Sequence, residues 1–247
     1  MLRESACTFV AVLALTSVGA ASPLVFSGSQ GNLAASVVFE VVDFSNLRIT
    51  LINTSSADVA VPSEVLTAVF FNLPGDPILT PTSALVGPGG TVLFGSAAPG
   101  GVVGGEWAYA MGLSGAPGGA RQGVSSVGLG LFGPHDLFPG VNLAGPDSPD
   151  GLQYGITSAG DDPTLGNQAV TGHFPLIRNS VIFTLSGLPE GFSLSGISNV
   201  TFQYGTDLAE PSFSIHTPEP GSVVLALIGF ALLFGGTLRR KLSRGTR

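Results

Sequence analysis

Apolar and polar residues alternate in three segments of the chain, 47–51, 181–186 and 200–204, interrupted only by Ile182. In each segment Leu, Ile, Val, Phe or Tyr stands at every second position. Successive side chains of a β-strand point to opposite faces of a sheet, so this period of two is typical of strands that are buried on one face only. The pattern therefore predicts three half-buried strands.

Further apolar segments of strand length are separated by turn-forming runs such as 74–77, 88–90 and 99–101, which are rich in proline and glycine. They are 35–42, 65–72, 91–95, 106–111, 127–132 and 152–157. No long helical pattern precedes residue 222. Together these features predict an all-β domain over residues 23–215, an antiparallel β-sandwich of the jelly-roll or immunoglobulin-like kind. A barrel and a solenoid stay open as alternatives, and the lack of a fixed-period repeat ranks the solenoid last.

A different pattern occupies the C-terminal end. The run 222–238 is apolar and uncharged, and as a helix it would reach about 25 Å, the short end of what crosses a bilayer. Five of the nine basic residues of the chain follow it in the tail 239–247. We expect a single transmembrane helix with a cytoplasmic C-terminus, and the domain before it outside. The alternative is a buried helix of a soluble protein. The residues expected to anchor the tail are Arg239, Arg240, Lys241 and Arg244.

The N-terminal segment 1–22 has the layout of a secretory signal peptide. Arg3 precedes the apolar stretch Cys7–Val18, and small residues follow at 18–21. Cys7 is the only cysteine, so its removal with the signal would leave an exported protein without thiols or disulfides.

The triplet Pro218, Glu219 and Pro220 stands directly before the apolar run. Two prolines hold a segment extended, so little conformational entropy is lost when an enzyme binds it, and Glu219 supplies one charge for orientation. The simpler interpretation is a linker that stops helix propagation.

The triplet, the hydrophobic helix and the Arg-rich end, in a chain with an N-terminal signal, resemble the PEP-CTERM sorting signal of Gram-negative bacteria, over residues 216–247. The resemblance implies recognition of the triplet by an exosortase, a membrane-embedded transpeptidase-like enzyme. It also implies a transient anchor in the inner membrane, removal of the helix, and delivery to the cell surface or the extracellular matrix, often in organisms that make exopolysaccharide.

The charge balance excludes one class of partner. All but two of the 16 acidic residues fall between Ser22 and Thr217, against three basic residues, Arg48, Arg121 and Arg178. A protein that binds nucleic acid must neutralise phosphates with a basic surface. We therefore expect no nucleic-acid partner.

Two groups of residues are candidates for ligand binding. Asp147, Asp150, Asp161 and Asp162 could converge on a calcium ion, which prefers oxygen ligands. Their spacing matches no EF-hand loop, and ordinary turn aspartates are the alternative. Trp107 and Tyr109 would lie on one face of a strand and could stack on a sugar, although a lone Trp is more often a core residue.

Signatures of catalysis are sparse. The string at 128–133 matches a dinucleotide fingerprint, but Pro134 follows and no helix opens, so we discard it. The three histidines stand too far apart for a metal motif, and Glu106 with Asp150 could serve a glycosidase only by default. We expect no enzyme and no cofactor. The predicted function is a sorted surface or matrix protein with a structural domain. A carbohydrate- or calcium-binding module is the alternative, and a polysaccharide hydrolase ranks below it.

Overall fold

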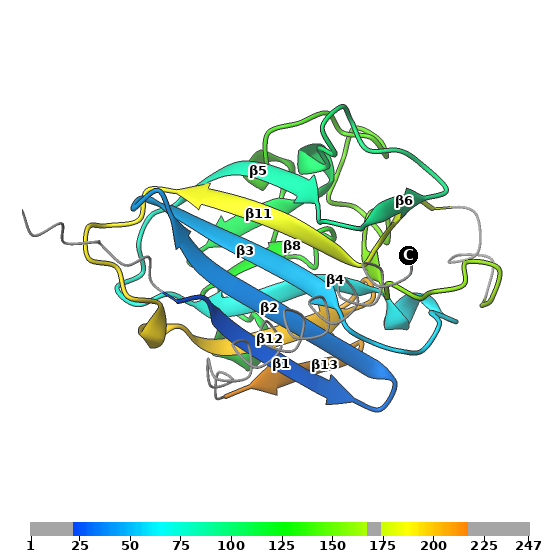
Figure 1. Cartoon of the computed structure of the whole chain (residues 1–247), viewed down its shortest axis with the longest axis horizontal. Helices are drawn as coiled ribbons and strands as arrows, with labels where there is room; N and C mark the ends of the chain where they lie inside the picture. Colours follow the sequence, from blue (N-terminus) through cyan, green and yellow to red (C-terminus); the bar gives the residue numbers. More distant parts are fainter. Residues whose placement is uncertain (1–21, 167–173, 217–247) are drawn as a thin grey trace, which may run out of the picture.

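The computed structural model describes residues 22–166 and 174–216, and these residues form two β-sheets with almost no helix (Figure 1). The prediction of an all-β domain is confirmed. The strands are β1 (Leu24–Gln30), β2 (Leu33–Val42), β3 (Asn46–Asn53), β4 (Leu66–Asn72), β5 (Thr80–Val86), β6 (Thr91–Leu93), β7 (Ala108–Met111), β8 (Gln122–Ser125), β9 (Ile156–Thr157), β10 (Leu176–Arg178), β11 (Ser180–Ser186), β12 (Ser198–Tyr204) and β13 (Ser212–Ile215). Three-residue 3₁₀ turns occur at η1 (Pro62–Glu64), η2 (Gly104–Glu106), η3 (Pro117–Gly119), η4 (Pro134–Asp136) and η5 (Leu194–Gly196).

Sheet A has the order β1-β2-β3-β11-β5, and all its strand pairs are antiparallel. Strands β1, β2 and β3 follow one another through short turns. Strand β11 comes from far along the chain and pairs with β3 over seven residues, from Ser180 opposite Ile52 to Ser186 opposite Asn46. The alternation in 47–51 and 181–185 therefore belongs to two neighbouring strands of one sheet.

Sheet B is organised around β4. Strand β12 pairs with one side of β4, and the other side is divided between β8, opposite residues 68–71, and β9, opposite Leu66. Strand β7 continues the sheet beyond β8, while β10 and β6 continue it beyond β9. The β9–β10 pair is parallel, whereas the sequence predicted only antiparallel pairing. Its strands are short, and the register shown pairs only Ile177 with Ile156 and Arg178 with Thr157.

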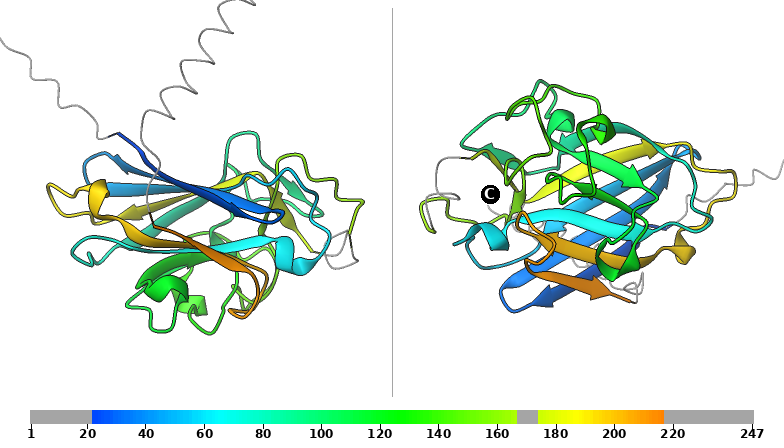
Figure 2. Two further views of the ribbon diagram at one scale, coloured as in Figure 1. Left: turned by 90° about the horizontal axis from the view of Figure 1, so that it is seen from below. Right: turned by 180° about the vertical axis from the view of Figure 1, so that it is seen from behind.

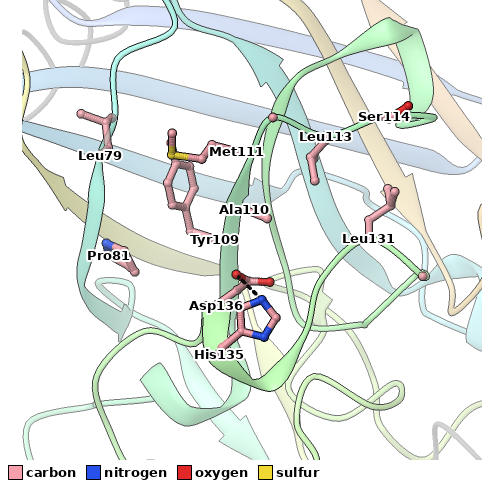
Figure 3. A pocket seen from close by; sticks show the side chains of 12 residues that line it. Leu79, Pro81, Tyr109, Ala110, Met111, Leu113, Ser114, Leu131, His135 and Asp136 are labelled. Atoms are coloured by element: carbon pink, nitrogen blue, oxygen red, sulfur yellow. Dashed lines mark ion pairs between the residues drawn. The ribbon is translucent and has the colours of Figure 1, made fainter.

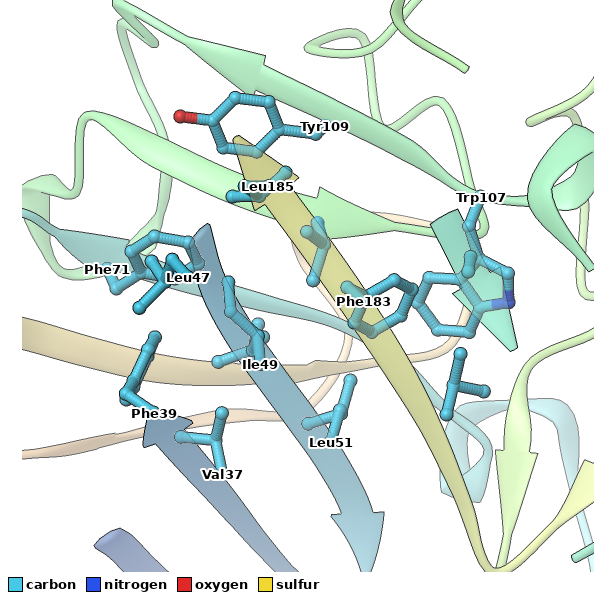
Figure 4. Close-up of a cluster of buried hydrophobic side chains, with 14 of the residues drawn as sticks. Val37, Phe39, Leu47, Ile49, Leu51, Phe71, Trp107, Tyr109, Phe183 and Leu185 are labelled. Carbon is cyan, nitrogen blue, oxygen red and sulfur yellow. The ribbon is translucent and has the colours of Figure 1, made fainter. Parts of the chain in front are cut away.

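The hydrophobic core lies between the two sheets (Figures 2 and 4). Phe39 of β2 meets Phe71 of β4 edge to face, with 5.2 Å between the ring centroids. Trp107 lies 4.9 Å from Phe183 of β11, measured between centroids, and both side chains are fully buried. Because every second residue of β3 and β11 points into this layer, the apolar residues of the alternating pattern are the ones that pack there.

Several predicted strands differ from those observed. The segment 127–132 is a turn rather than a strand, because Leu129 and Gly130 both have positive φ and the N–H groups of Leu131 and Phe132 donate to the Gly128 carbonyl. In 152–157 only the last two residues are strand, since Tyr154 has a φ of 58°. Strands β1, β5, β8, β10 and β13 were not predicted.

The predictions for the two ends of the chain fall mainly on residues that the structure does not describe. The signal segment apart from Ser22, the triplet 218–220, the apolar run 222–238 and the basic tail 239–247 all lie outside the described residues. Within residues 22–166 and 174–216, no helix has the length and apolarity needed to cross a membrane.

Candidate functional site

A hollow of about 530 Å³ opens on the surface beside β7 (Figure 3). Its wall comes from three parts of the chain: the start of β5, strand β7 with the turn after it, and the loop 130–136. The apolar side chains along it are Leu79, Pro81, Ala110, Met111, Leu113 and Leu131, and the polar ones are Tyr109, Ser114, His135 and Asp136.

Tyr109 lines this hollow, and its hydroxyl oxygen is buried in the wall. Its side chain is 4% exposed, and among the described residues its hydroxyl has no hydrogen-bond partner. Burial raises the pKa of the Tyr109 phenol, and the negative charge of Asp76 raises it further, so the group stays a neutral donor at physiological pH. A buried polar group without a partner costs free energy. Because this oxygen is closed off from solvent, a ligand in the hollow reaches it only after Tyr109 or a neighbouring side chain moves.

His135 and Asp136 form the polar rim. His135 Nε2 lies 3.3 Å from Asp136 Oδ1, and the His135 side chain is 82% exposed, whereas that of Asp136 is 21% exposed. The other carboxylate oxygen of Asp136 accepts a hydrogen bond from the Gly133 N–H at 2.8 Å and so caps the η4 turn. One oxygen of the carboxylate therefore faces its histidine neighbour at the surface while the other one holds the loop.

Taken together, the hollow offers an apolar wall and, at its rim, one carboxylate acceptor, with the Tyr109 hydroxyl buried behind the wall. This combination suits a ring with an apolar face and peripheral hydroxyl groups, because carboxylates accept hydroxyl hydrogen bonds and aliphatic side chains pack on C–H faces. Sequence reasoning placed Tyr109 on a ligand-binding strand but considered His135 only as a metal ligand. The signal it missed is the glycine-rich turn 128–133, which brings His135 and Asp136 to β7.

Glu106 and Asp150 were the default pair for a glycosidase. Glu106 is 1% exposed, and its carboxylate accepts hydrogen bonds from the Leu143 N–H, from the Ala144 N–H at 2.8 Å and from Ser148 Oγ at 3.1 Å. Burial raises its pKa, these hydrogen bonds lower it by less, and the charge of nearby Asp150 adds to the rise. Glu106 is thus an internal anchor for the loop 142–148.

The four candidate calcium ligands do not gather at one point. Asp161 Oδ1 accepts the Val59 N–H at 2.8 Å, while Asp162 Oδ1 accepts both the N–H of Thr164 at 3.0 Å and its hydroxyl at 2.8 Å. These hydrogen bonds hold the pKa of Asp162 below its usual range. Within the described part of the chain, no group of three or more His, Cys, Asp or Glu residues is arranged to hold a metal ion. The described contacts of Asp161 and Asp162 are those of turn residues.

Trp107 does not face a ligand. It is fully buried and packs on Phe183 in the main core, so it is the core residue that a lone Trp in a β-domain most often is. The turn at 128–133 leads into the three-residue η4, so no helix follows the glycine string. Of the histidines, His135 lies at the hollow, His216 is exposed at the end of the described residues, and His173 lies outside them.

No family model, no curated protein and no solved structure matches this chain.

Proposed function

We propose that this protein is an exported surface or extracellular-matrix protein that an exosortase-like membrane enzyme recognises and processes at Pro218-Glu219-Pro220. In this proposal the segment 1–22 directs export, and the helix 222–238 anchors the intermediate in the inner membrane. The basic residues Arg239, Arg240, Lys241 and Arg244 hold the C-terminus on the cytoplasmic side. After processing, the β-domain remains at the cell surface or in the matrix.

The observation that carries the proposal is the position of the triplet relative to the folded domain. Strand β13 ends at Ile215, and the described core is built from side chains that precede it. The triplet begins three residues later, between this last strand and the apolar run. An enzyme could therefore cut there without unfolding a described strand, as a sorting reaction requires.

The domain suits a structural role in this proposal. We assign it to the β-sandwiches, because two sheets enclose one apolar layer. It departs from the regular jelly-roll or immunoglobulin-like strand order in two places. The β9–β10 pair is parallel, and one side of β4 pairs with two strands, β8 and β9. Its acidic surface disfavours nucleic acid and leaves neutral or cationic polymers, including exopolysaccharide, as matrix partners.

Mass spectrometry of the C-terminus of the protein from the surface of native cells tests the sorting proposal. We expect the mature chain to end near the triplet, and we expect Pro218→Ala combined with Pro220→Ala to leave the protein in the inner membrane. The matched control is Pro211→Ala, a proline outside the triplet, which should leave sorting unchanged. Surface material with an intact Arg247, or normal sorting of the double variant, would overturn the proposal.

A carbohydrate-binding module is a second candidate for the domain, favoured by the hollow at β7. Tyr109→Phe deletes only a hydroxyl that has no described partner. If a sugar uses that hydroxyl, glycan binding should weaken about two- to twelvefold, since one hydrogen bond is worth about 0.5–1.5 kcal/mol. The melting temperature should not fall. Two results on a glycan array would argue against this site. One is that the wild-type chain binds no glycan, and the other is that Tyr109→Phe binds a glycan as well as the wild type does.

A further inference from the structure

The edge strands of the two sheets differ in how they are protected, and β1 stands out. It pairs with β2 over all seven residues, from Leu24 opposite Phe39 to Gln30 opposite Leu33, without a bulge. It contains no proline and no charged residue. Among the described residues no strand pairs with its other side. Natural proteins usually protect a strand of this kind, because its unpaired backbone groups can bind another chain.

The hairpin turn between β1 and β2 shows which backbone groups face outward. Gln30 and Leu33 close a two-residue turn in which Gly31 has a φ of 61°, and the closing pair of such a turn is hydrogen-bonded. Pairs then alternate along the ladder, so Val25, Ser27 and Ser29 direct their N–H and C=O groups away from β2. The Thr54 N–H donates to the Ala34 carbonyl at 2.9 Å, which agrees with this assignment because Ala34 faces β3.

The opposite edge of sheet A, at β5, is covered. The segment after β6 returns along this strand, where the Val86 N–H donates to the Gly101 carbonyl and the Val103 N–H donates to the Ala84 carbonyl, both at 2.9 Å. Pro81 removes one donor from β5, and the β5–β11 register shifts beside it. Proline, a bulge and a covering segment are three of the known ways to block an edge.

The edges of sheet B are short or covered as well. Strand β13 has four residues and follows Pro211, and β6 has three residues. The Phe138 N–H donates to the Trp107 carbonyl at 2.9 Å, and Leu137 bridges Ala108, so a loop covers the start of β7. Among the described edges, β1 is therefore the long and regular one that no other segment covers.

The charge distribution restricts a contact between two copies of the chain to this edge. The chain carries a net charge of −7, so two copies repel each other over most of their surfaces. No charged residue stands between Glu4 and Glu40, a stretch that includes all of β1 and most of β2. The inner face of β1 is already occupied, since a β-carbon on Gly28 would collide with Ile215 of β13. An uncharged contact between two copies can therefore form through the outward backbone groups of β1.

We propose that two copies of this protein join through β1, edge to edge and antiparallel, so that sheet A continues from one molecule into the next. An antiparallel pair of identical strands has twofold symmetry, and the outward groups of Val25, Ser27 and Ser29 then serve both as donors and as acceptors for the same groups of the other copy. The inference does not depend on how the C-terminal tail is processed.

Cysteine cross-linking in the full chain tests the proposal, in a Cys7→Ser background that has no other cysteine. Directly paired Cα atoms in a hydrogen-bonded antiparallel pair are about 5.5 Å apart, within the range of a disulfide. Oxidation of intact cells that express Ser27→Cys should therefore give a covalent dimer on a non-reducing gel. Val25→Cys and Ser29→Cys test neighbouring registers. Ser212→Cys on β13 is the matched control and should stay monomeric.

A proline variant separates backbone pairing from mere proximity. Ser29→Pro removes an outward N–H of β1 and should reduce the Ser27→Cys dimer severalfold without lowering the melting temperature by more than Ser212→Pro does. The β12–β13 ladder directs the Ser212 N–H outward as well, because the Tyr204 N–H donates to the Pro211 carbonyl. Dimers in none of the three β1 cysteine variants, equal dimers in Ser212→Cys, or an effect of Ser212→Pro equal to that of Ser29→Pro would each overturn the proposal.

Discussion

Sheet A and the long segment between β6 and β9 are held together in different ways. Each strand of sheet A has at least seven residues, and its inward side chains share one apolar layer. The segment 94–155 contains only two four-residue strands, β7 and β8. Regular strands spread their stabilisation over many equivalent contacts, whereas irregular loops depend on a few particular hydrogen bonds.

Three side chains illustrate the second case. Glu106 holds Leu143, Ala144 and Ser148, and Asp136 holds the Gly133 N–H. Ser125 Oγ donates to the Val127 carbonyl at 2.7 Å and accepts its N–H at 3.0 Å. The comparison teaches that the loops beside the hollow are positioned by buried polar groups, so a single substitution can loosen them while sheet A stays intact.

The largest expected effect is in the shared apolar layer. Phe183→Ala removes the ring that packs on both Trp107 and Phe138, at centroid distances of 4.9 and 5.3 Å. It should lower the free energy of unfolding by about 3–5 kcal/mol, as measured by denaturant titration. Phe44→Ala is the control, because Phe44 is 77% exposed and its loss should cost far less. Equal losses for both variants would contradict this view of the core.

A smaller and local effect is expected at Glu106. Glu106→Ala leaves the Leu143 N–H without an acceptor and the Ala144 N–H with only Asn142 Oδ1, at 3.2 Å, for a cost of about 2–3 kcal/mol. Hydrogen exchange should accelerate at these two amides much more than in β3 or β11. Glu190→Ala, at an exposed position, serves as the control. Uniform acceleration over both sheets would show that the loop and sheet A are not separate in stability.

The smallest expected effect is a pH dependence at the same carboxylate. Because burial raises the pKa of Glu106 above its ordinary value of 4.5, the folded state holds this proton more tightly than the unfolded state. The wild type should therefore lose stability relative to Glu106→Gln as pH rises from about 4.5 through the raised pKa, and the difference should then level off. Unfolding free energies of both proteins across this range measure it. If the wild type instead lost stability relative to Glu106→Gln as pH fell, the pKa of Glu106 would be lowered by folding, and the prediction would be wrong.

In both sheets the sequence predicted the strands with alternating or continuous apolar side chains better than the other strands, for a physical reason. Strands β3 and β11 bury mainly one face, so their side chains alternate visibly, and β2 and β4 are long apolar runs. Strand β12 alternates as well, but the prediction that it is half-buried was wrong, because Thr201 and Gln203 on its other face are also buried. Strand β1 was not predicted because its second half, 27–30, is polar and contains a glycine, as turns often do, yet it is an edge strand that pairs with β2 over its whole length. Turns such as 128–132 contain enough apolar residues to resemble a strand, and only the positive φ of Leu129 and Gly130 distinguishes them.

The hollow was predicted even less well than the strands. Tyr109 was a candidate because of its residue type. It lines the same hollow as His135 and Asp136 only because the chain folds back to β7 after the 25 residues that separate Tyr109 from His135. The isolated bridge between Ala108 and Leu137 fixes that return. Contacts of this kind leave no period in the sequence, so they become visible only when the chain is folded.

The pairing of β3 with β11 also constrains the time course of folding. Strand β3 ends at Asn53, and its partner does not begin until Ser180, so a chain that is synthesised from its N-terminus presents the Leu- and Ile-rich side of β3 long before β11 arrives. Closing so long a loop is slow, and an open apolar strand invites wrong partners meanwhile. A holdase chaperone that binds extended apolar segments would be most useful to this protein during that interval.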